Sequence, residues 1–288
     1  MQMNDENNSF QANYTIQVKG KLMDFSTTKV MGIVNLTPDS FHVESRFQNE
    51  ENILKQVEEM LAEGADFIDL GAFSSRPGAE MISEEEEKER LIPALQSIVK
   101  KFPSCCISID TYRSEVAKIA VNEGAAIIND ISAGTFDSKM FSTIAQLHVP
   151  YIIMHMQGEP KSMQQNPTYN DVVNEVYYFF SQQLKQLNEL KVNDVILDVG
   201  FGFGKRLEHN YSLLKNMNFF QQLERPLLAG LSRKGMIQKV LDIDAAGALN
   251  GSTAAHVLAL LNGVNILRVH DVKEAKQAID IVNFYQKQ

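Results

Sequence analysis

Short apolar runs alternate with longer amphipathic stretches along almost the whole chain. Each run is rich in β-branched residues and is apolar at both alternating positions, which is typical of a strand buried on both faces. Eight runs predict strands: Val30–Val34, Phe67–Gly71, Cys105–Asp110, Ala126–Asp130, Tyr151–His155, Val195–Val199, Leu227–Leu231 and Asn265–Val269.

Stretches with a helical repeat of apolar residues separate these runs. They are Glu50–Glu63, Ser83–Lys101, Ser114–Asn122, Met140–Leu147, Val172–Leu190, Asn210–Asn216, Gly235–Val240, Gly251–Leu261 and Lys273–Tyr285. Ser83, followed three residues later by Glu86, has the pattern of a capping box. Alternating strands and helices predict parallel strands joined by crossovers, and eight such units predict an α/β fold of the (β/α)₈ TIM barrel type. A doubly wound open sheet is the alternative.

The residues before the first of these strands predict an N-terminal addition to the barrel. Tyr14–Val18 and Lys21–Phe25 flank Lys19-Gly20, which indicates a β-hairpin within residues 13–26 that covers the N-terminal mouth. Residues 1–12 are polar, and we expect a flexible tail there. The length of 288 residues suits one barrel, so we expect residues 13–288 to form a single domain.

Charge and composition limit the classes of partner. The formal net charge is −9 and no basic block is present, which argues against nucleic acid and anionic membranes as partners. We find no secretory signal pattern and no apolar run of the roughly 20 residues that cross a bilayer. Cys105 and Cys106 are neighbours whose side chains point to opposite faces of a strand, so we expect no disulfide between them. These features favour a cytoplasmic protein that binds small molecules.

Polar residues gather where the predicted strands end. In strand order these are Asn35, Ser74–Gly78, Asp110, Asn129-Asp130, His155, Asp198 with Gly200–Lys205, Ser232–Lys234 and Arg268–Asp271. In a (β/α)₈ barrel the catalytic groups lie at the C-terminal ends of the strands. Because buried polar groups are costly unless paired, so many at one rim indicate a site.

The ends of the last two strands carry the cations that an anionic substrate needs. Ser232 and Lys234 are two residues apart, as are Arg268 and His270, so each pair points the same way if the strands extend that far. These strand ends often form a phosphate site in this fold, and an arginine can bind phosphate oxygens with two N–H groups.

The glycine-rich segment after Asp198 is not an ATP-binding loop. Three residues separate Gly200 from Gly204, where a Walker A motif has four, and Arg206 follows Lys205 in place of serine or threonine. We expect instead a mobile loop that carries Phe203 over a flat ligand. The sequence has no HExxH motif and no Cys/His cluster, which argues against zinc.

These segments together resemble the dihydropteroate synthases, which are pterin-binding TIM-barrel enzymes. The matching segments, in chain order, are Met31–Phe41, Ser74–Ala79, Ile109–Arg113, Ile128–Ile131, Met154–Gly158, Asp198 with Gly200–Lys205, Ser232–Lys234 and Arg268–Asp271. One such motif is weak evidence, but eight in order at barrel spacing are specific. The resemblance covers nearly all of the chain after residue 28.

The resemblance implies a transferase of folate biosynthesis. Such an enzyme joins 6-hydroxymethyl-7,8-dihydropterin diphosphate to p-aminobenzoate, releases diphosphate and is a sulfonamide target. It also implies Mg²⁺ and a homodimer. The implied catalytic residues are Asp110, Asp198, Lys234 and Arg268.

The same resemblance assigns ligands to the other rim residues. We expect the pterin edge to contact Asp110, Asn129 and Asp198, with Lys234 at the pterin carbonyl and Met154 in the pocket wall. The metal is expected at Asn35, and the diphosphate at Arg268 and His270. The p-aminobenzoate site is expected to consist of Ser75, Pro77, Phe203, Ser232 and Lys234, with Arg76 ordering its loop and with Ile131 and Gly230 as further substrate contacts. Paired carboxylates suit a donor-rich heterocycle, and an arylamine attacks without a dedicated general base.

One departure directly follows the first matching segment. Family members usually have an acidic residue and two glycines after Ser40-Phe41, whereas this chain has His42-Val43-Glu44-Ser45-Arg46 at positions 42–46. Losing the glycines restricts the turn, so we expect altered affinity for p-aminobenzoate or sulfonamides. Phe73, Val199 and Gly235 also differ from the usual residues, away from the chemistry.

Other functions fit parts of the pattern. A barrel that presents methyltetrahydrofolate to a corrinoid protein would share Asp110, Asn129 and Asp198, but would not need Lys234 and Arg268 around a diphosphate. A non-catalytic pterin binder is favoured only by the altered turn. An unrelated phosphate-binding barrel would leave the ordered motifs as coincidence.

Overall fold

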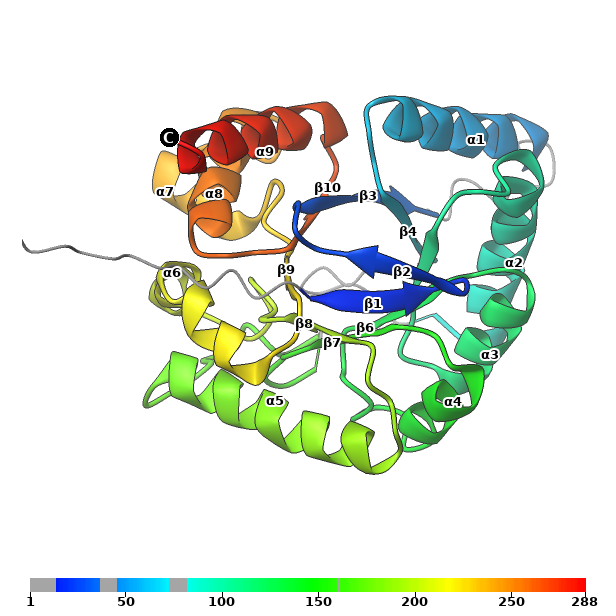
Figure 1. Cartoon of the computed structure of the whole chain (residues 1–288), viewed down its shortest axis with the longest axis horizontal. Coiled ribbons are helices and arrows are strands. Elements are labelled where there is room, and N and C mark those ends of the chain that lie inside the picture. Colours follow the sequence, from blue (N-terminus) through cyan, green and yellow to red (C-terminus); the bar gives the residue numbers. More distant parts are fainter. Residues whose placement is uncertain (1–13, 37–45, 73–81, 160) are drawn as a thin grey trace, which may run out of the picture.

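The computed structural model describes residues 14–36, 46–72, 82–159 and 161–288. Eight parallel strands close into a barrel, with β10 hydrogen-bonded to β3 through the pair Leu267↔Val30 (Figure 1). The strands are β3 (Lys29–Asn35), β4 (Phe67–Gly71), β5 (Ile107–Asp110), β6 (Ile127–Asp130), β7 (Tyr151–Met154), β8 (Val195–Asp198), β9 (Leu227–Ala229) and β10 (Ile266–Val269). The predicted TIM barrel is confirmed, and the open-sheet alternative is wrong.

Helices surround the barrel and follow the strands in alternation (Figure 1). They are α1 (Arg46–Ala62), α2 (Glu84–Lys101), α3 (Ser114–Asn122), α4 (Met140–Leu147), α5 (Val172–Glu189), α6 (Leu207–Lys215), α7 (Gly235–Leu241), α8 (Leu249–Leu261), α9 (Val272–Gln286) and the 3₁₀ helix η2 (Met217–Leu223). The helix η2 was not predicted because so short a segment shows no clear repeat. At α2, the Ser83 hydroxyl accepts from the Glu86 backbone N–H at 3.1 Å, as the capping pattern predicts.

The predicted hairpin is present at the N-terminal side of the barrel. β1 (Thr15–Val18) and β2 (Lys21–Asp24) pair antiparallel through Lys19 and Gly20, which both have positive φ, as a tight two-residue turn requires. Ile16, Val18 and Phe25 pack with residues of the barrel interior. The hairpin therefore closes this mouth, as Figure 1 shows. The predicted tail, residues 1–12, lies outside the described residues.

The barrel interior is apolar at the hairpin end and polar at the opposite end. Inward-facing residues near the hairpin include Met31, Phe67, Ile127, Ile152, Ile196, Leu228 and Ile266. Two positions further along, the residues with the same parity are Ile33, Asp69, Asn129, Met154, Asp198, Gly230 and Arg268. The switch from apolar to polar layers places the candidate chemistry at the C-terminal strand ends.

The two cysteines behave as buried apolar residues. Cys105 packs between the barrel and its helices, whereas Cys106 packs against the interior cluster, so they face opposite sides as predicted. Both thiols are free, and burial raises the pKa of Cys105 to about 11 and that of Cys106 to about 12. Separately, none of the helices in the described part of the chain is long and apolar enough to cross a membrane.

Candidate active site

A hydrogen-bonded set of four residues lies at the C-terminal mouth of the barrel. Arg268 of β10 donates from Nε to Asp69 Oδ2 of β4 at 2.7 Å and from Nη2 to Asp110 Oδ2 of β5 at 3.0 Å. Asn129 of β6 donates from Nδ2 to the same Asp69 oxygen at 3.0 Å. The structure thus brings the predicted residues Arg268, Asp110 and Asn129 together around one carboxylate.

Asp69 itself was missed in the sequence. It stands in the middle of an otherwise apolar strand and has 0 % of its surface exposed. A charged residue at an inward position of a buried strand was the available signal, because such a group needs a partner inside the barrel. The prediction considered only residues at strand ends, and Asp69 lies two residues before the end of β4.

The Asp110 carboxyl is set to titrate near neutral pH. Burial raises its pKa to about 7; the charge of Arg268 opposes this rise, while Asp69, Glu87 and Asp130 add to it. Its Oδ2 bonds Arg268, whereas its Oδ1 is buried and makes no hydrogen bond within the described residues. One carboxylate oxygen at the mouth is therefore available to accept a hydrogen bond from a ligand.

Asp198 and Lys234 form a second charged group on the other side of the mouth. Asp198 accepts from the Gly200 backbone N–H at 2.8 Å, and burial raises its pKa against the lowering effect of Lys234 and Arg268. Lys234 donates to the Phe201 carbonyl at 2.6 Å, and burial lowers its pKa to about 8. Both groups have lost solvation, so an incoming polar ligand would interact with them strongly.

Apolar side chains form a wall beside these charges. Ile131, Met154 and Phe203 are buried in one cluster with Tyr112 and Met163. The Nζ of Lys234 lies 4.3 Å from the centroid of the Phe203 ring, within the range of a cation–π contact. An apolar wall next to hydrogen-bonding carboxylates suits a flat heterocycle with a polar edge.

Lys205 holds the glycine-rich loop between β8 and α6. Its Nζ lies 3.0 Å from Nδ1 of His155 and donates to the carbonyl oxygens of His155 at 3.1 Å, Gly200 at 3.0 Å and Phe203 at 3.0 Å. Lys205 and His155 are both buried. Burial and the charge of Lys205 lower the pKa of His155 well below its usual value. These contacts favour a fixed loop over the mobile loop that we expected from its glycines.

Two glycines of this loop are required by close backbone approach. Gly200 has φ +71°, and a Cβ atom there would lie 2.1 Å from the His155 carbonyl oxygen. Gly204 has φ +61°, and its Cβ would lie 2.2 Å from the Gln157 carbonyl oxygen. The glycines therefore let the loop pack on the segment after β7.

Ser232 and His270 meet at the ends of β9 and β10. The Ser232 hydroxyl accepts from the His270 backbone N–H at 3.3 Å and lies 3.2 Å from its Nδ1. The strands do not extend far enough for either predicted pair to share a strand parity, because β9 ends at Ala229, before Ser232, and β10 ends at Val269, before His270. At Gly230, an added Cβ would meet no atom within 4 Å, so this inward position leaves space in the mouth.

The remaining predicted residues are partly outside the described chain. Asn35 ends β3 beside Gly71 of β4, and it is exposed. Ser75, Arg76 and Pro77 lie outside the described residues, as does the altered turn at 42–44. In the part of the chain that the structure describes, no group of three or more His, Cys, Asp or Glu residues could hold a metal ion.

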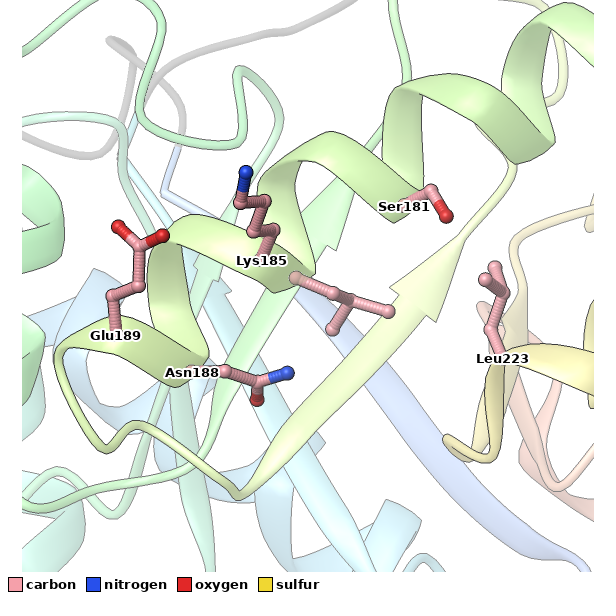
Figure 2. Close-up of a pocket in the computed structure, with 6 residues that line it drawn as sticks. Ser181, Lys185, Asn188, Glu189 and Leu223 are labelled. Carbon is pink, nitrogen blue, oxygen red and sulfur yellow. The ribbon is translucent and has the colours of Figure 1, made fainter.

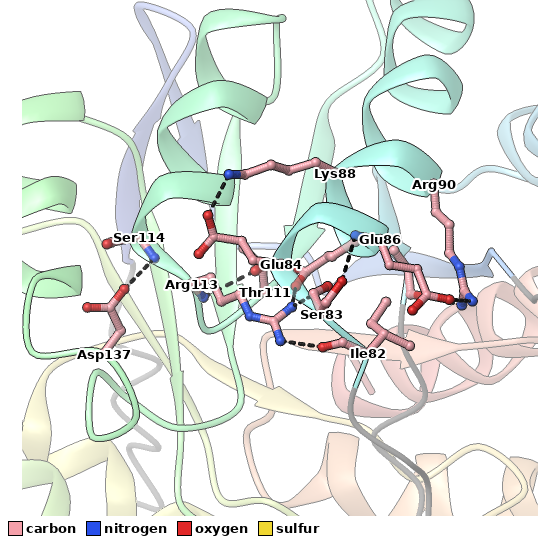
Figure 3. A network of polar contacts seen from close by, with 12 residues as sticks. Ile82, Ser83, Glu84, Glu86, Lys88, Arg90, Thr111, Arg113, Ser114 and Asp137 are labelled. Atoms are coloured by element: carbon pink, nitrogen blue, oxygen red, sulfur yellow. Dashed lines mark hydrogen bonds and ion pairs between the residues drawn. The ribbon is translucent and has the colours of Figure 1, made fainter.

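A polar network ties β5 to the start of α2 (Figure 3). Arg113, three residues after Asp110, pairs with the buried Glu87 and donates to the backbone carbonyls of Ile82 and Ser83. Burial raises the pKa of Glu87 even though a hydrogen bond with Thr111 and the charge of Arg113 lower it. The network fixes the strand end that carries Asp110 relative to the residues following segment 73–81.

A surface hollow elsewhere has none of this chemistry. Figure 2 shows its lining on α5 and the neighbouring Leu223: Ser181, Leu184, Lys185, Asn188, Glu189 and Leu223. None of the predicted site residues lines it. The barrel mouth, where buried charges converge, is therefore the better candidate site.

Comparison with known proteins shows the family of this chain. The family model described as "Pterin binding enzyme" matches residues 31–270. The dihydropteroate synthase of Haemophilus influenzae is 41% identical over 268 residues, covering 92% of this chain and 97% of that protein. Among solved structures, Yersinia pestis dihydropteroate synthase with a sulfonamide drug has a TM-score of 0.89 at 37% identity, covering 96% of this chain and 100% of that one. Xanthomonas albilineans dihydropteroate synthase with 4-aminobenzoic acid has a TM-score of 0.88 at 34% identity, covering 96% and 99%.

Proposed function

The chain belongs to the dihydropteroate synthases of the pterin-binding enzyme family, and from this premise we propose that its barrel mouth joins 6-hydroxymethyl-7,8-dihydropterin diphosphate to p-aminobenzoate in folate biosynthesis. One observation carries the proposal: buried carboxylates and cations converge beside an apolar wall at one mouth. It is the arrangement that a flat, polar-edged substrate with an anionic leaving group requires.

The pterin edge is assigned to Asp110, Asn129 and Asp198. The dihydropterin ring presents N–H donors that carboxylate oxygens accept, and the unpartnered Asp110 Oδ1 supplies one acceptor. Lys234 is assigned to the ring carbonyl; for this its Nζ has further N–H donors besides the one bonded to the Phe201 carbonyl. Met154, Ile131 and Phe203 belong to the apolar wall.

The diphosphate is assigned to Arg268 and His270. A guanidinium has five N–H donors, of which the structure gives one to Asp69 and one to Asp110, so others remain for phosphate oxygens. His270 follows two residues later, next to Ser232. Charge-assisted bonds of this kind stabilise the leaving group as negative charge develops on it.

The reaction breaks one bond and forms another. The C–O bond between the pterin methylene and diphosphate breaks, and both electrons leave with diphosphate. The arylamine nitrogen forms the new C–N bond and then releases a proton. Positive charge that develops in the ring is stabilised by Asp110 and Asp198, so these residues act through their charge and need not take a proton.

We propose that Mg²⁺ binds together with the diphosphate. Mg²⁺ prefers oxygen ligands and often combines few protein groups with substrate phosphates. The exposed amide of Asn35 at the strand end provides one such oxygen, and the lack of a three-residue cage among the described residues fits a metal completed by substrate. Bound there, the metal would neutralise charge on the leaving group.

The p-aminobenzoate site is assigned to Phe203, Ser232 and Lys234 together with Ser75, Arg76 and Pro77. The first three lie around the mouth described above, and Gly230 leaves open space beside them. The Xanthomonas structure contains 4-aminobenzoic acid, and the Yersinia structure a sulfonamide drug. We therefore propose that sulfonamides compete at this position.

We further propose that the protein is a homodimer. Large apolar side chains are exposed on three helices that pack together, α7, α8 and α9 (Figure 1). They are Val240, Leu241, Leu258, Leu261, Ile281, Phe284 and Tyr285. Exposed apolar patches often mark interfaces between subunits. Sedimentation velocity tests the proposal. We expect twice the mass of one chain for the wild type, and the mass of one chain for the double variant Leu258→Glu with Leu261→Glu. A wild type that is a monomer at micromolar concentration would contradict the proposal.

Diphosphate release with and without p-aminobenzoate tests the function. If diphosphate release depends on p-aminobenzoate, the protein is a synthase. A barrel that binds pterin for methyl transfer, or that binds pterin without catalysing a reaction, would not show this dependence. The cytoplasmic location stays a prediction of the sequence, as does the absence of nucleic-acid partners.

A further inference from the structure

We propose that Asp69 is a positioning residue that orients both Arg268 and Asn129 for the substrate. The inference rests on the proposed function, because it concerns how that reaction's residues are held. Asp69 is buried inside the barrel, two residues before the end of β4, and it contacts Arg268 and Asn129 at once. It would therefore act through these residues without touching the reacting atoms.

The contact with Arg268 determines which side of the guanidinium faces the mouth. Nε lies 2.7 Å from Asp69 Oδ2, so this edge of the guanidinium points to β4 in the barrel. The Asp69 side chain is fully buried and forms an ion pair with Arg268. A charge-assisted hydrogen bond of this kind is strong where water is excluded. Fixing Nε fixes the plane of the fork and leaves the terminal nitrogens for partners nearer the mouth.

The contact with Asn129 determines which atom of its amide faces the ligand. Nδ2 donates to Asp69 Oδ2 at 3.0 Å. Rotating the amide by half a turn would place its carbonyl oxygen against a carboxylate oxygen, which is repulsive. Asp69 therefore holds the Asn129 carbonyl oxygen away from itself, where it can accept a hydrogen bond from a pterin N–H.

Asp69 and Asp110 share Arg268 but differ in position and in the partners of Oδ2. Each has a buried Oδ1 that makes no hydrogen bond within the described residues, but Asp110 is the last residue of β5, so its Oδ1 can turn to the pterin edge. Asp69 is two residues before the end of β4, and its Oδ2 binds both Arg268 and Asn129. We infer that Asp110 exchanges Arg268 for substrate, while Asp69 keeps Arg268 in place throughout.

A kinetic comparison of Asp69→Asn with wild type tests this role. The substitution keeps the size of the side chain but removes its charge and one acceptor. We expect kcat to fall and KM for dihydropterin diphosphate to rise, each roughly tenfold, since small displacements of aligned groups cost about that much or more. KM for p-aminobenzoate should change less than about twofold, because Asp69 contacts no residue assigned only to that substrate.

The pH profile adds a measurement that loss of stability would not change. Burial raises the pKa of Asp110 most; the cations Arg268 and Lys234 oppose this rise, and the carboxylates Asp69, Glu87 and Asp130 add to it. Removing the Asp69 charge lowers the Asp110 pKa. If ionised Asp110 is needed, the acid limb of kcat/KM then moves to lower pH.

Ser108→Ala is the matched control. Ser108 is the register neighbour of Asp69 on β5, is equally buried, and makes no hydrogen bond through its hydroxyl within the described residues. It should leave both KM values and the acid limb unchanged. An Asp69→Asn enzyme with wild-type kcat, KM and acid limb would overturn the inference; a wild type without p-aminobenzoate-dependent release would instead overturn the proposed function.

A measurement on the wild type covers the case in which Asp69→Asn does not fold. In ¹⁵N-labelled protein, the Arg268 Nε–H resonance, assigned with Arg268→Lys, should exchange slowly with water because of its buried bond to Asp69. It should stay protected when inorganic diphosphate and 6-hydroxymethylpterin are added. Loss of protection on adding these ligands would show that Asp69 releases Arg268, which contradicts the inference.

Discussion

The ammonium nitrogen of Lys205 lies 3.0 Å from Nδ1 of His155, and no carboxylate is hydrogen-bonded to it in the described structure. Its other partners are three backbone carbonyls of the glycine-rich loop and of the segment after β7. Burial lowers the pKa of Lys205 to about 7. This lysine therefore connects two segments that line the mouth, through hydrogen bonds and without an ion pair at contact distance.

We predict that Lys205→Met destabilises the protein and loosens this loop. Several buried acceptors lose their donor, and each such loss costs about 1–3 kcal/mol. The pKa of Lys205 in the folded state lies below its unfolded value of 10.5. Between about pH 7 and 10.5 the unfolded chain therefore binds more protons than the folded chain, and the contribution of Lys205 to the free energy of unfolding rises with pH. Urea unfolding should give a wild-type-minus-variant difference that grows from pH 7 to 9; a flat or falling difference contradicts the assignment.

We predict that Gly200→Ala strongly destabilises the protein. The added Cβ would lie 2.1 Å from a backbone carbonyl at a positive φ, where neither can move easily. Gly235→Ala is the control, because a Cβ there meets no atom within 4 Å. Thermal unfolding should show a fall of several degrees for the first variant and about none for the second. Equal melting temperatures would show that the loop lies further from His155 than described.

We predict that Arg113→Ala costs about 3–5 kcal/mol, because it leaves the buried Glu87 charge without its cationic partner. Adding Glu87→Gln should restore part of this loss, since the remaining group is then neutral. Denaturant unfolding of the two variants measures the difference. No recovery in the double variant would mean that the carbonyl contacts of Arg113 to Ile82 and Ser83 carry the stability, and not the ion pair.

We predict that the turn at residues 42–44 tunes inhibitor affinity. Replacing His42→Asp, Val43→Gly and Glu44→Gly gives the acidic-glycine-glycine turn usual in the family and allows backbone angles that the present residues restrict. The affinity for sulfonamide, or KM for p-aminobenzoate, should shift severalfold, while KM for dihydropterin diphosphate stays unchanged. Inhibition identical to that of the parent would exclude a role for this turn.

The barrel could be predicted because its signals are local. Strand and helix periods, and polar residues at successive strand ends, follow directly from the chain, and most boundaries agree within a few residues. Among the helices, the one predicted from Glu50 begins at Arg46 and the one predicted from Asn210 begins at Leu207. Among the strands, the largest differences are that the one predicted from Cys105 begins at Ile107 and the one predicted to Leu231 ends at Ala229. Strand ends depend on where hydrogen bonding to the neighbouring strand stops, which a single run of residues does not specify.

The site was predicted less completely because its contacts are between strands. Arg268, Asp110 and Asn129 were expected at one rim, but Asp69, which joins two of them, lies far from each in sequence. The loop carrying Phe203 was expected to be mobile because glycines permit many conformations. Its fixed form depends on Lys205 and His155, which are 50 residues apart.

The central claim is tested most directly by diphosphate release from purified protein given Mg²⁺ and 6-hydroxymethyl-7,8-dihydropterin diphosphate, with and without p-aminobenzoate. We predict release that requires p-aminobenzoate and yields 7,8-dihydropteroate in equal amount. Asp110→Asn should lower kcat/KM by about 100-fold or more, and wild-type kcat/KM should fall below about pH 7 as Asp110 is protonated. Binding of the pterin without product, or release indifferent to p-aminobenzoate, would contradict the proposed function.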